Sequence, residues 1–127
     1  MIKTKNLTHY YNKDLAIENI NLEINAGDFV CFIGESGSGK STLLSILSTL
    51  LKPTSGEIIY EDINYANINN IDKFRKENVG FIFQFHYLIN YLTIKENIKL
   101  ANENAKEEEI VKLLRKLGIE ELKDKNP

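Results

Sequence analysis

A short stretch from Gly34 to Thr42 combines the residue types needed to hold a phosphate group. It matches the pattern G-x-x-x-x-G-K-[ST]. Glycines adopt backbone conformations closed to other residues, so consecutive N–H groups can turn inward around an anion. The stretch therefore predicts a phosphate-binding loop, whose members are Gly34, Glu35, Ser36, Gly37, Ser38, Gly39, Lys40, Ser41 and Thr42.

Three side chains at the end of this loop suit a magnesium-bound nucleotide. Lys40 brings a mobile positive charge for the β- and γ-phosphates, and Ser41 offers a hydroxyl ligand for Mg²⁺. Thr42 adds a hydroxyl near the α- and β-phosphates. The alternative is a glycine-rich turn that holds no ligand. That alternative does not explain why a lysine and a hydroxyl follow the last glycine.

The loop needs a strand before it and a helix after it. Residues 29–33 form an apolar run that predicts a buried strand, with Cys31 as a small core residue. Residues 40–47 open a helix that ends before Pro53, and its predicted apolar face carries Leu43, Leu44, Leu47 and Leu50. Residues 20–25 alternate as a half-exposed strand, and residues 57–60 follow a turn as another strand.

The second half of the chain predicts one more strand and two helices. Residues 79–83 are a short apolar run that stops at the polar Gln84. Capping-box patterns predict helix starts at Thr93 and, in looser form, at Asn104. The last helix should end at Gly118. Its predicted core face contains Ile110, Val111, Leu113, Leu114 and Leu117.

Composition excludes several classes of protein. The chain has 127 residues, of which 43% are hydrophobic and 27% charged, as in a globular domain. A net charge of −2 and two arginines argue against a nucleic-acid partner. Neither a signal peptide nor a run of transmembrane length is present, so we expect a cytoplasmic chain. His9 and His86 have no metal-ligand spacing and are expected to be solvated loop residues.

Beyond the phosphate loop, three further features resemble the ATP-binding subunits of ABC transporters, and the resemblance runs from Met1 to the end of the chain. One of them is the segment 92–98, which is similar to the family's exit from the Q-loop. Tyr11 lies where that family places an aromatic residue that stacks on adenine, and Tyr10 is the alternative stacker. The sequence Val-Gly-Phe-Ile-Phe-Gln, ending at Gln84, is similar to the family's Q-loop. The resemblance implies ATP and Mg²⁺ as cofactors, Lys40 and Gln84 as catalytic residues, and Ser41 and Gln84 as metal ligands.

The same resemblance implies the fold and the partners. The expected fold class is α/β, a P-loop NTPase core with an N-terminal antiparallel β segment, with residues 1–127 as a partial nucleotide-binding domain. The segments 52–58 and 92–98 look most like the subgroup that serves lipoprotein release and macrolide or antimicrobial-peptide export. Membrane subunits and a second ATP-binding subunit are the implied partners. The resemblance also implies that the chain is located at the inner face of the cell membrane.

Several motifs of that family do not occur in the sequence. We find no Leu-Ser-Gly-Gly-Gln-like signature, no apolar strand ending in Asp-Glu, no D-loop and no switch histidine. We therefore expect an incomplete sheet and no ATP hydrolysis by this chain alone. Two functions remain open, an ATPase subunit that powers export and a nucleotide-binding or interaction module without hydrolytic activity. A small P-loop kinase or GTPase fits poorly, because neither a substrate lid nor Asn-Lys-x-Asp occurs.

Overall fold

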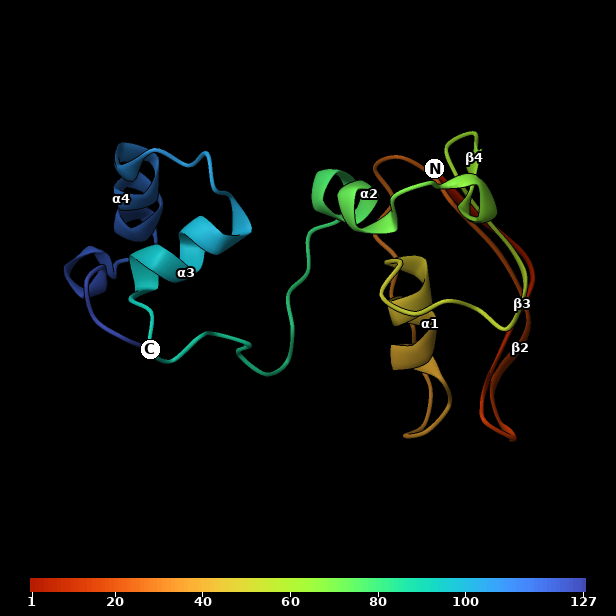
Figure 1. Cartoon of the computed structure of the whole chain (residues 1–127). Coiled ribbons are helices and arrows are strands. Elements are labelled where there is room, and N and C mark those ends of the chain that lie inside the picture. Colours follow the sequence, from red (N-terminus) through yellow and green to blue (C-terminus); the bar gives the residue numbers. More distant parts are fainter. The chain divides into compact units, whose positions relative to one another are not determined.

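The chain forms two compact units. A computed structural model describes residues 1–127 and divides them into Met1–Gly80, here called unit 1, and Phe81–Pro127, called unit 2. Figure 1 shows the strands gathered in the first unit and the helices α3 and α4 in the second. None of the helices is both long enough and apolar enough to cross a membrane.

Unit 1 is built on an antiparallel sheet with the strand order β2-β1-β3-β4. The strands are β1 (Ile2–Tyr11), β2 (Asp14–Ile24), β3 (Ser55–Tyr60) and β4 (Ile63–Asn64). β1 pairs with β2 on one side and with β3 on the other, and both pairings are antiparallel. Asn12 turns the chain between the first two strands in the left-handed region, with a φ of 55°. The predicted N-terminal antiparallel β segment is therefore confirmed.

Helix α1 (Lys40–Leu47) packs against this sheet (Figure 1) and completes its core. The core consists of Leu7, Ile17, Leu43, Ile46, Leu47, Ile58 and Tyr60. The buried positions of the helix follow i, i+3 and i+4 spacing from Leu43, which turns Leu44 away from the sheet. Leu44 is 51% exposed, and Leu50 lies beyond the helix and is 45% exposed. The prediction that these two leucines share the buried face is wrong.

A short helix that the sequence patterns did not predict covers the end of α1. It is α2 (Ile71–Asn78), preceded by the 3-10 turn η1 (Tyr65–Asn67). Asn70 caps α2 by accepting a 2.9 Å hydrogen bond from the Lys73 N–H. The Phe74 ring lies 5.1 Å from that of Tyr60, and the Arg75 guanidinium donates to the Thr49 carbonyl at 2.7 Å. These contacts fix α2 against β3 and the segment that follows α1.

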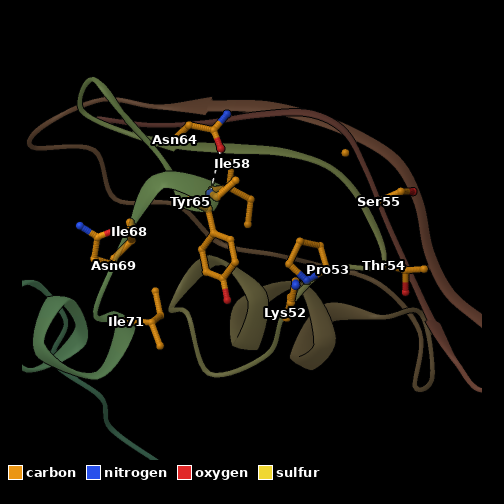
Figure 2. Close-up of a pocket in the computed structure, with 12 residues that line it drawn as sticks. Lys52, Pro53, Thr54, Ser55, Ile58, Asn64, Tyr65, Ile68, Asn69 and Ile71 are labelled. Atoms are coloured by element: carbon orange, nitrogen blue, oxygen red, sulfur yellow. Dashed lines mark hydrogen bonds between the residues drawn. The ribbon is translucent and has the colours of Figure 1, made fainter.

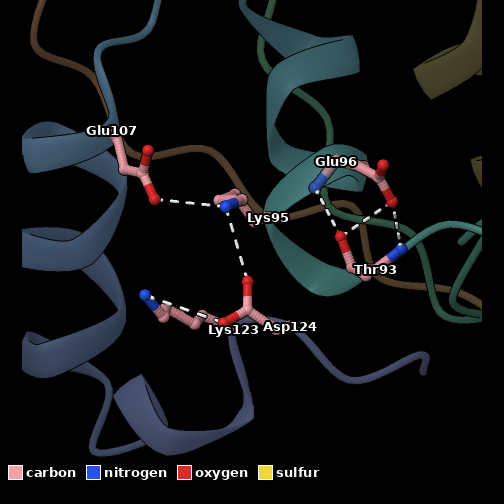
Figure 3. A network of polar contacts seen from close by, with 6 residues as sticks. All are labelled: Thr93, Lys95, Glu96, Glu107, Lys123 and Asp124. Atoms are coloured by element: carbon pink, nitrogen blue, oxygen red, sulfur yellow. Dashed lines mark hydrogen bonds and ion pairs between the residues drawn. The ribbon is translucent and has the colours of Figure 1, made fainter.

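Unit 2 contains α3 (Ile94–Ala101), α4 (Glu107–Lys116) and the 3-10 turn η2 (Glu120–Leu122). The capping box predicted at Thr93 is present, since the Thr93 hydroxyl accepts from the Glu96 N–H while the Glu96 carboxylate accepts from the Thr93 N–H (Figure 3). The start predicted at Asn104 is wrong. α4 begins at Glu107, and the Glu109 carboxylate accepts the N–H of the cap residue Lys106 at 2.9 Å.

The core face of α4 is narrower than its sequence predicts. Ile110 and Leu114 are buried, with Val111 half-buried beside them. Leu113 and Leu117 are 45% and 62% exposed. The buried stripe of α4 is one face wide, so apolar residues at its margin stay in contact with water.

Three charged side chains tie the elements of unit 2 together (Figure 3). The Lys95 ammonium lies 3.1 Å from the Glu107 carboxylate and 3.4 Å from that of Asp124. The backbone N–H groups of Ile94 and Lys95 also donate to carbonyls of the C-terminal segment, at 2.9 and 3.0 Å. The start of α3 is therefore joined both to α4 and to the segment after η2.

The two apolar runs predicted as buried strands do not form strands. Residues 29–33 and 79–83 make no ladder, and Phe29, Ile33 and Ile82 are 98%, 92% and 101% exposed. Cys31, predicted as a core residue, is exposed as well. A strand of a parallel sheet is buried only when neighbours pair with it and cover both faces. No segment of residues 1–127 pairs with either run, so most of their side chains remain exposed, while Phe32 is half-buried against the core.

Candidate phosphate-binding site

The backbone of residues 34–42 has the conformation that the glycine pattern predicts. Gly37 and Gly39 lie in the left-handed region with φ of 82° and 84°, where a side chain would be strained. At Gly34 a Cβ atom would approach the Ser38 hydroxyl oxygen to 2.8 Å. The loop is thus folded tightly on itself, and its backbone requires glycine at positions 37 and 39.

The Lys40 side chain folds back over the loop. Its ammonium donates to the Gly34 carbonyl at 2.9 Å, to the Glu35 carbonyl, and to the Ser38 hydroxyl at 3.3 Å. All three partners are neutral oxygens, so the positive charge of Lys40 is not neutralised by these contacts. A bound phosphate would offer charged oxygens in their place.

The loop leads directly into the N-terminus of α1. Gly39 is the cap residue and contributes no side-chain hydrogen bond, so the first backbone N–H groups of the helix are available to an anion. Ser41 is exposed in the first turn, whereas Thr42 is buried. These residues fit a magnesium-bound phosphate chain, with Ser41 as the hydroxyl that can reach the metal.

Tyr11 reaches this loop from the end of β1. Its hydroxyl lies 3.4 Å from Oγ1 of Thr42, and its side chain is 49% exposed. The geometry brings Tyr11, rather than the alternative Tyr10, to the phosphate-binding loop.

His9 is a residue of this site that the sequence patterns missed. It was expected in a solvated loop, but it lies within β1, is 7% exposed, and packs its ring edge-on against Tyr11 with centroids 4.8 Å apart. Simple alternation could not have found it, because the register of β1 shifts between Leu7 and His9 and the three residues from Leu7 to His9 are all buried. His86, in contrast, is exposed as expected.

Gln84 lies in unit 2, outside helices and strands, and is exposed. Aromatic residues on both sides of it in the sequence contact one another, since the Phe81 and Phe83 rings stack 4.7 Å apart and Phe83 meets Tyr87 edge-on at 4.8 Å. The phosphate-binding loop belongs to unit 1. The role of Gln84 toward Mg²⁺ and water stays a prediction.

Unit 1 also has a pocket of about 460 Å³ away from the loop (Figure 2). It is lined by residues 52–56, Ile58, residues 64–66, Ile68, Asn69 and Ile71. In Figure 2 the Tyr65 ring extends across it toward Pro53 and Lys52. None of the predicted site residues lines this pocket. The candidate functional site is therefore the loop with Tyr11, and not the pocket.

A glycine-rich loop that enters a helix beside an antiparallel sheet defines a P-loop nucleotide-binding protein. Comparison with known families agrees and is more specific, because the family model described as ABC transporter matches residues 17–127. The chain belongs to the ABC transporter family, as a part of its ATP-binding domain.

Relatives of this chain include proteins named for export. It is 37% identical over 135 aligned residues to the macrolide export ATP-binding/permease protein MacB of Campylobacter jejuni, an alignment covering 100% of this chain and 21% of MacB. It is 38% identical over 124 residues to the bacitracin export ATP-binding protein BceA of Halalkalibacterium halodurans, covering 91% of this chain and 49% of BceA. The chain thus spans half or less of the length of these relatives.

Solved structures agree with the fold. The ATP-binding cassette MJ0796, in a dimeric post-hydrolysis state bound to ADP and Pi, superposes with a TM-score of 0.86 at 34% identity, covering 100% of this chain and 62% of that one. The corresponding protein of Methanocaldococcus jannaschii is 42% identical over 106 residues, covering 79% of this chain and 45% of its own. The predicted fold class is therefore confirmed as that of an ABC ATPase cassette.

Proposed function

We propose that this chain binds Mg·ATP through residues 34–42 and contributes that binding to an ABC transporter that exports its substrate. The single observation that carries the proposal is the Lys40 ammonium, held over the loop by neutral oxygens of Gly34, Glu35 and Ser38. A cation in that position is ready to exchange these contacts for charged phosphate oxygens, which accept stronger hydrogen bonds.

Further residues of the loop and outside it have a part in this proposal. The N–H groups around Gly37 and Gly39 hold the phosphates, and Tyr11 offers its half-exposed ring to the adenine base. Ser41 and Gln84 are the proposed ligands of Mg²⁺. When bound, Mg²⁺ neutralises phosphate charge and orients the phosphate oxygens.

The direction of transport and the partners are proposed from the relatives. MacB and BceA are both named for export, and MacB is named as an ATP-binding and permease protein. MJ0796 is described as a dimer. By analogy, the partners of this chain are membrane subunits and a second ATP-binding subunit, and its place is the inner face of the membrane.

The proposal is tested by calorimetric titration of residues 1–127 with Mg·ATP. We expect Lys40→Ala to weaken binding at least about tenfold, the effect of losing one charge-assisted contact. Lys112→Ala is the matched control, because Lys112 is exposed on α4 and should bind as the unaltered chain does. Absence of binding by the unaltered chain, or equal binding by a folded Lys40→Ala variant, would refute the proposal.

A further inference from the structure

The surroundings of His9 are those of a residue that positions another side chain. It is 7% exposed, and its Nε2 atom is buried without a hydrogen-bond partner. A buried polar atom without a partner is unfavourable, and an apolar side chain would avoid that penalty. The imidazole must therefore have a role that simple filling of the core does not require.

One side of the imidazole is anchored by Thr54. The Thr54 hydroxyl oxygen accepts the Tyr10 N–H at 3.1 Å and lies 3.4 Å from Nδ1 of His9. A hydroxyl oxygen can accept a second hydrogen bond as well as donate its own, so this contact can hold Nδ1 in either tautomer of the ring. The hydroxyl thus sets the orientation of the ring.

The other side of the imidazole supports Tyr11. The two rings meet edge-on, with an interplanar angle of 84° and centroids 4.8 Å apart, which is a favoured geometry for aromatic pairs. The far end of the tyrosine is held by its hydroxyl contact with Thr42, at 3.4 Å. Tyr11 is thereby supported both at its ring and at its hydroxyl, while half of its surface stays exposed.

From this chain of contacts we infer that His9 is a positioning residue, which fixes the ring of Tyr11 in the orientation that stacks on the base of a nucleotide. The inference rests on the proposed function. His9 itself does not touch the nucleotide. Substitution of His9 should therefore weaken binding of the base and leave binding of the phosphates unchanged, because residues 34–42 hold the phosphates.

Two probes separate these effects, Mg·ATP and magnesium tripolyphosphate, which has the phosphates without the base. We expect His9→Ala to weaken Mg·ATP binding roughly threefold and Tyr11→Ala roughly tenfold, while tripolyphosphate binding changes less than about twofold. In the Tyr11→Ala background, His9→Ala should have no further effect on either probe. His9→Phe keeps a ring at this position and should restore most of the Mg·ATP affinity.

One spectroscopic measurement on the nucleotide-free chain completes the test. The Tyr11 ring protons should have dispersed shifts that become averaged in His9→Ala. Equal weakening of both probes by His9→Ala would show a general structural role and overturn the inference, as would unchanged Mg·ATP binding. If the unaltered chain binds tripolyphosphate but has no preference for ATP, the phosphate site stands and the role of His9 is overturned. If it binds neither probe, both proposals fall.

Discussion

Gly39 lies so close to Ala16 that no side chain fits between the phosphate-binding loop and β2. A Cβ atom on Gly39 would stand 2.4 Å from the Ala16 carbonyl oxygen and 2.6 Å from Cγ2 of Ile17. Gly37 has nearly the same φ, 82° against 84°, but nothing lies within 4 Å of its Cβ position. The two glycines share a backbone requirement, and only Gly39 also has a packing requirement.

This difference makes Gly39→Ala and Gly37→Ala a matched pair. Both substitutions place a side chain in the left-handed region, at about 1–2 kcal/mol. Gly39→Ala adds overpacking against backbone, which costs typically a further 1–3 kcal/mol. We expect Gly39→Ala to lower the free energy of unfolding by more than Gly37→Ala does. Urea denaturation of each variant, followed by NMR signals of residues in unit 1, measures both losses. Equal losses would mean that the loop does not rest on β2.

The phosphate-binding loop and its helix could be predicted because their signals are local. Gly37 and Gly39 are required by turns within the loop itself, and α1 begins at the residue that the pattern indicates. The same holds for the capping box at Thr93, where both hydrogen bonds join residues three positions apart.

The features that the sequence patterns predicted wrongly or missed depend on distant parts of the chain. Residues 29–33 have the composition of a buried strand, but burial requires neighbouring strands that a local pattern cannot supply. The environment of His9 depends on Thr54, which is far along the sequence and reaches β1 only through the fold. Helix α2 has a predominantly polar sequence and is held by Phe74 and Arg75, contacts that no periodicity reveals.

The ion pairs of Lys95 predict how unit 2 responds to acid. The hydrogen bond from Lys95 and its positive charge hold the pKa of Glu107 below its ordinary value of 4.5. A carboxyl group whose pKa is lowered by folding stabilises the folded state above its unfolded pKa, and that stabilisation is lost as the pH falls through the folded value. We therefore expect the α3–α4 pair to loosen only below about pH 4.5.

An NMR titration of the Glu107 carboxyl carbon in unaltered and Lys95→Met chains measures this effect. The pKa of Glu107 should return toward 4.5 in Lys95→Met. Lys112→Met, on the exposed side of α4, should leave it low. A Glu107 pKa that is the same in all three chains would show that the contact with Lys95 at 3.1 Å does not persist in solution.

Gln84 is proposed to act through Mg²⁺ and water, and not through the phosphates. Gln84→Ala should then weaken Mg·ATP binding by no more than about threefold, the loss of roughly one neutral hydrogen bond. It should leave ATP binding in EDTA unchanged. Asn90→Ala, at an exposed position of the same unit, is the control in both titrations. A tenfold loss in both conditions would instead assign Gln84 a structural role.

The exposed run from Phe29 to Ile33 predicts that the chain associates with itself. Phe29 and Ile33 are almost fully exposed, and the run of five residues has no charge and no proline. Short uncharged segments with high β-propensity and unpaired backbone groups readily pair with another chain. We expect residues 1–127 to form concentration-dependent oligomers in light scattering, and to bind the dye ANS.

Charge placed within the run should prevent this association without disturbing the core, because neither Phe29 nor Ile33 belongs to it. The double variant Phe29→Lys and Ile33→Lys is therefore expected to remain monomeric at concentrations where the unaltered chain associates. Leu15→Lys is the control, since Leu15 is a half-exposed leucine on β2 outside the run. If Leu15→Lys suppresses association as well as the double variant does, added charge alone accounts for the effect. Suppression by the double variant alone would identify the unpaired segment as the surface through which two copies meet.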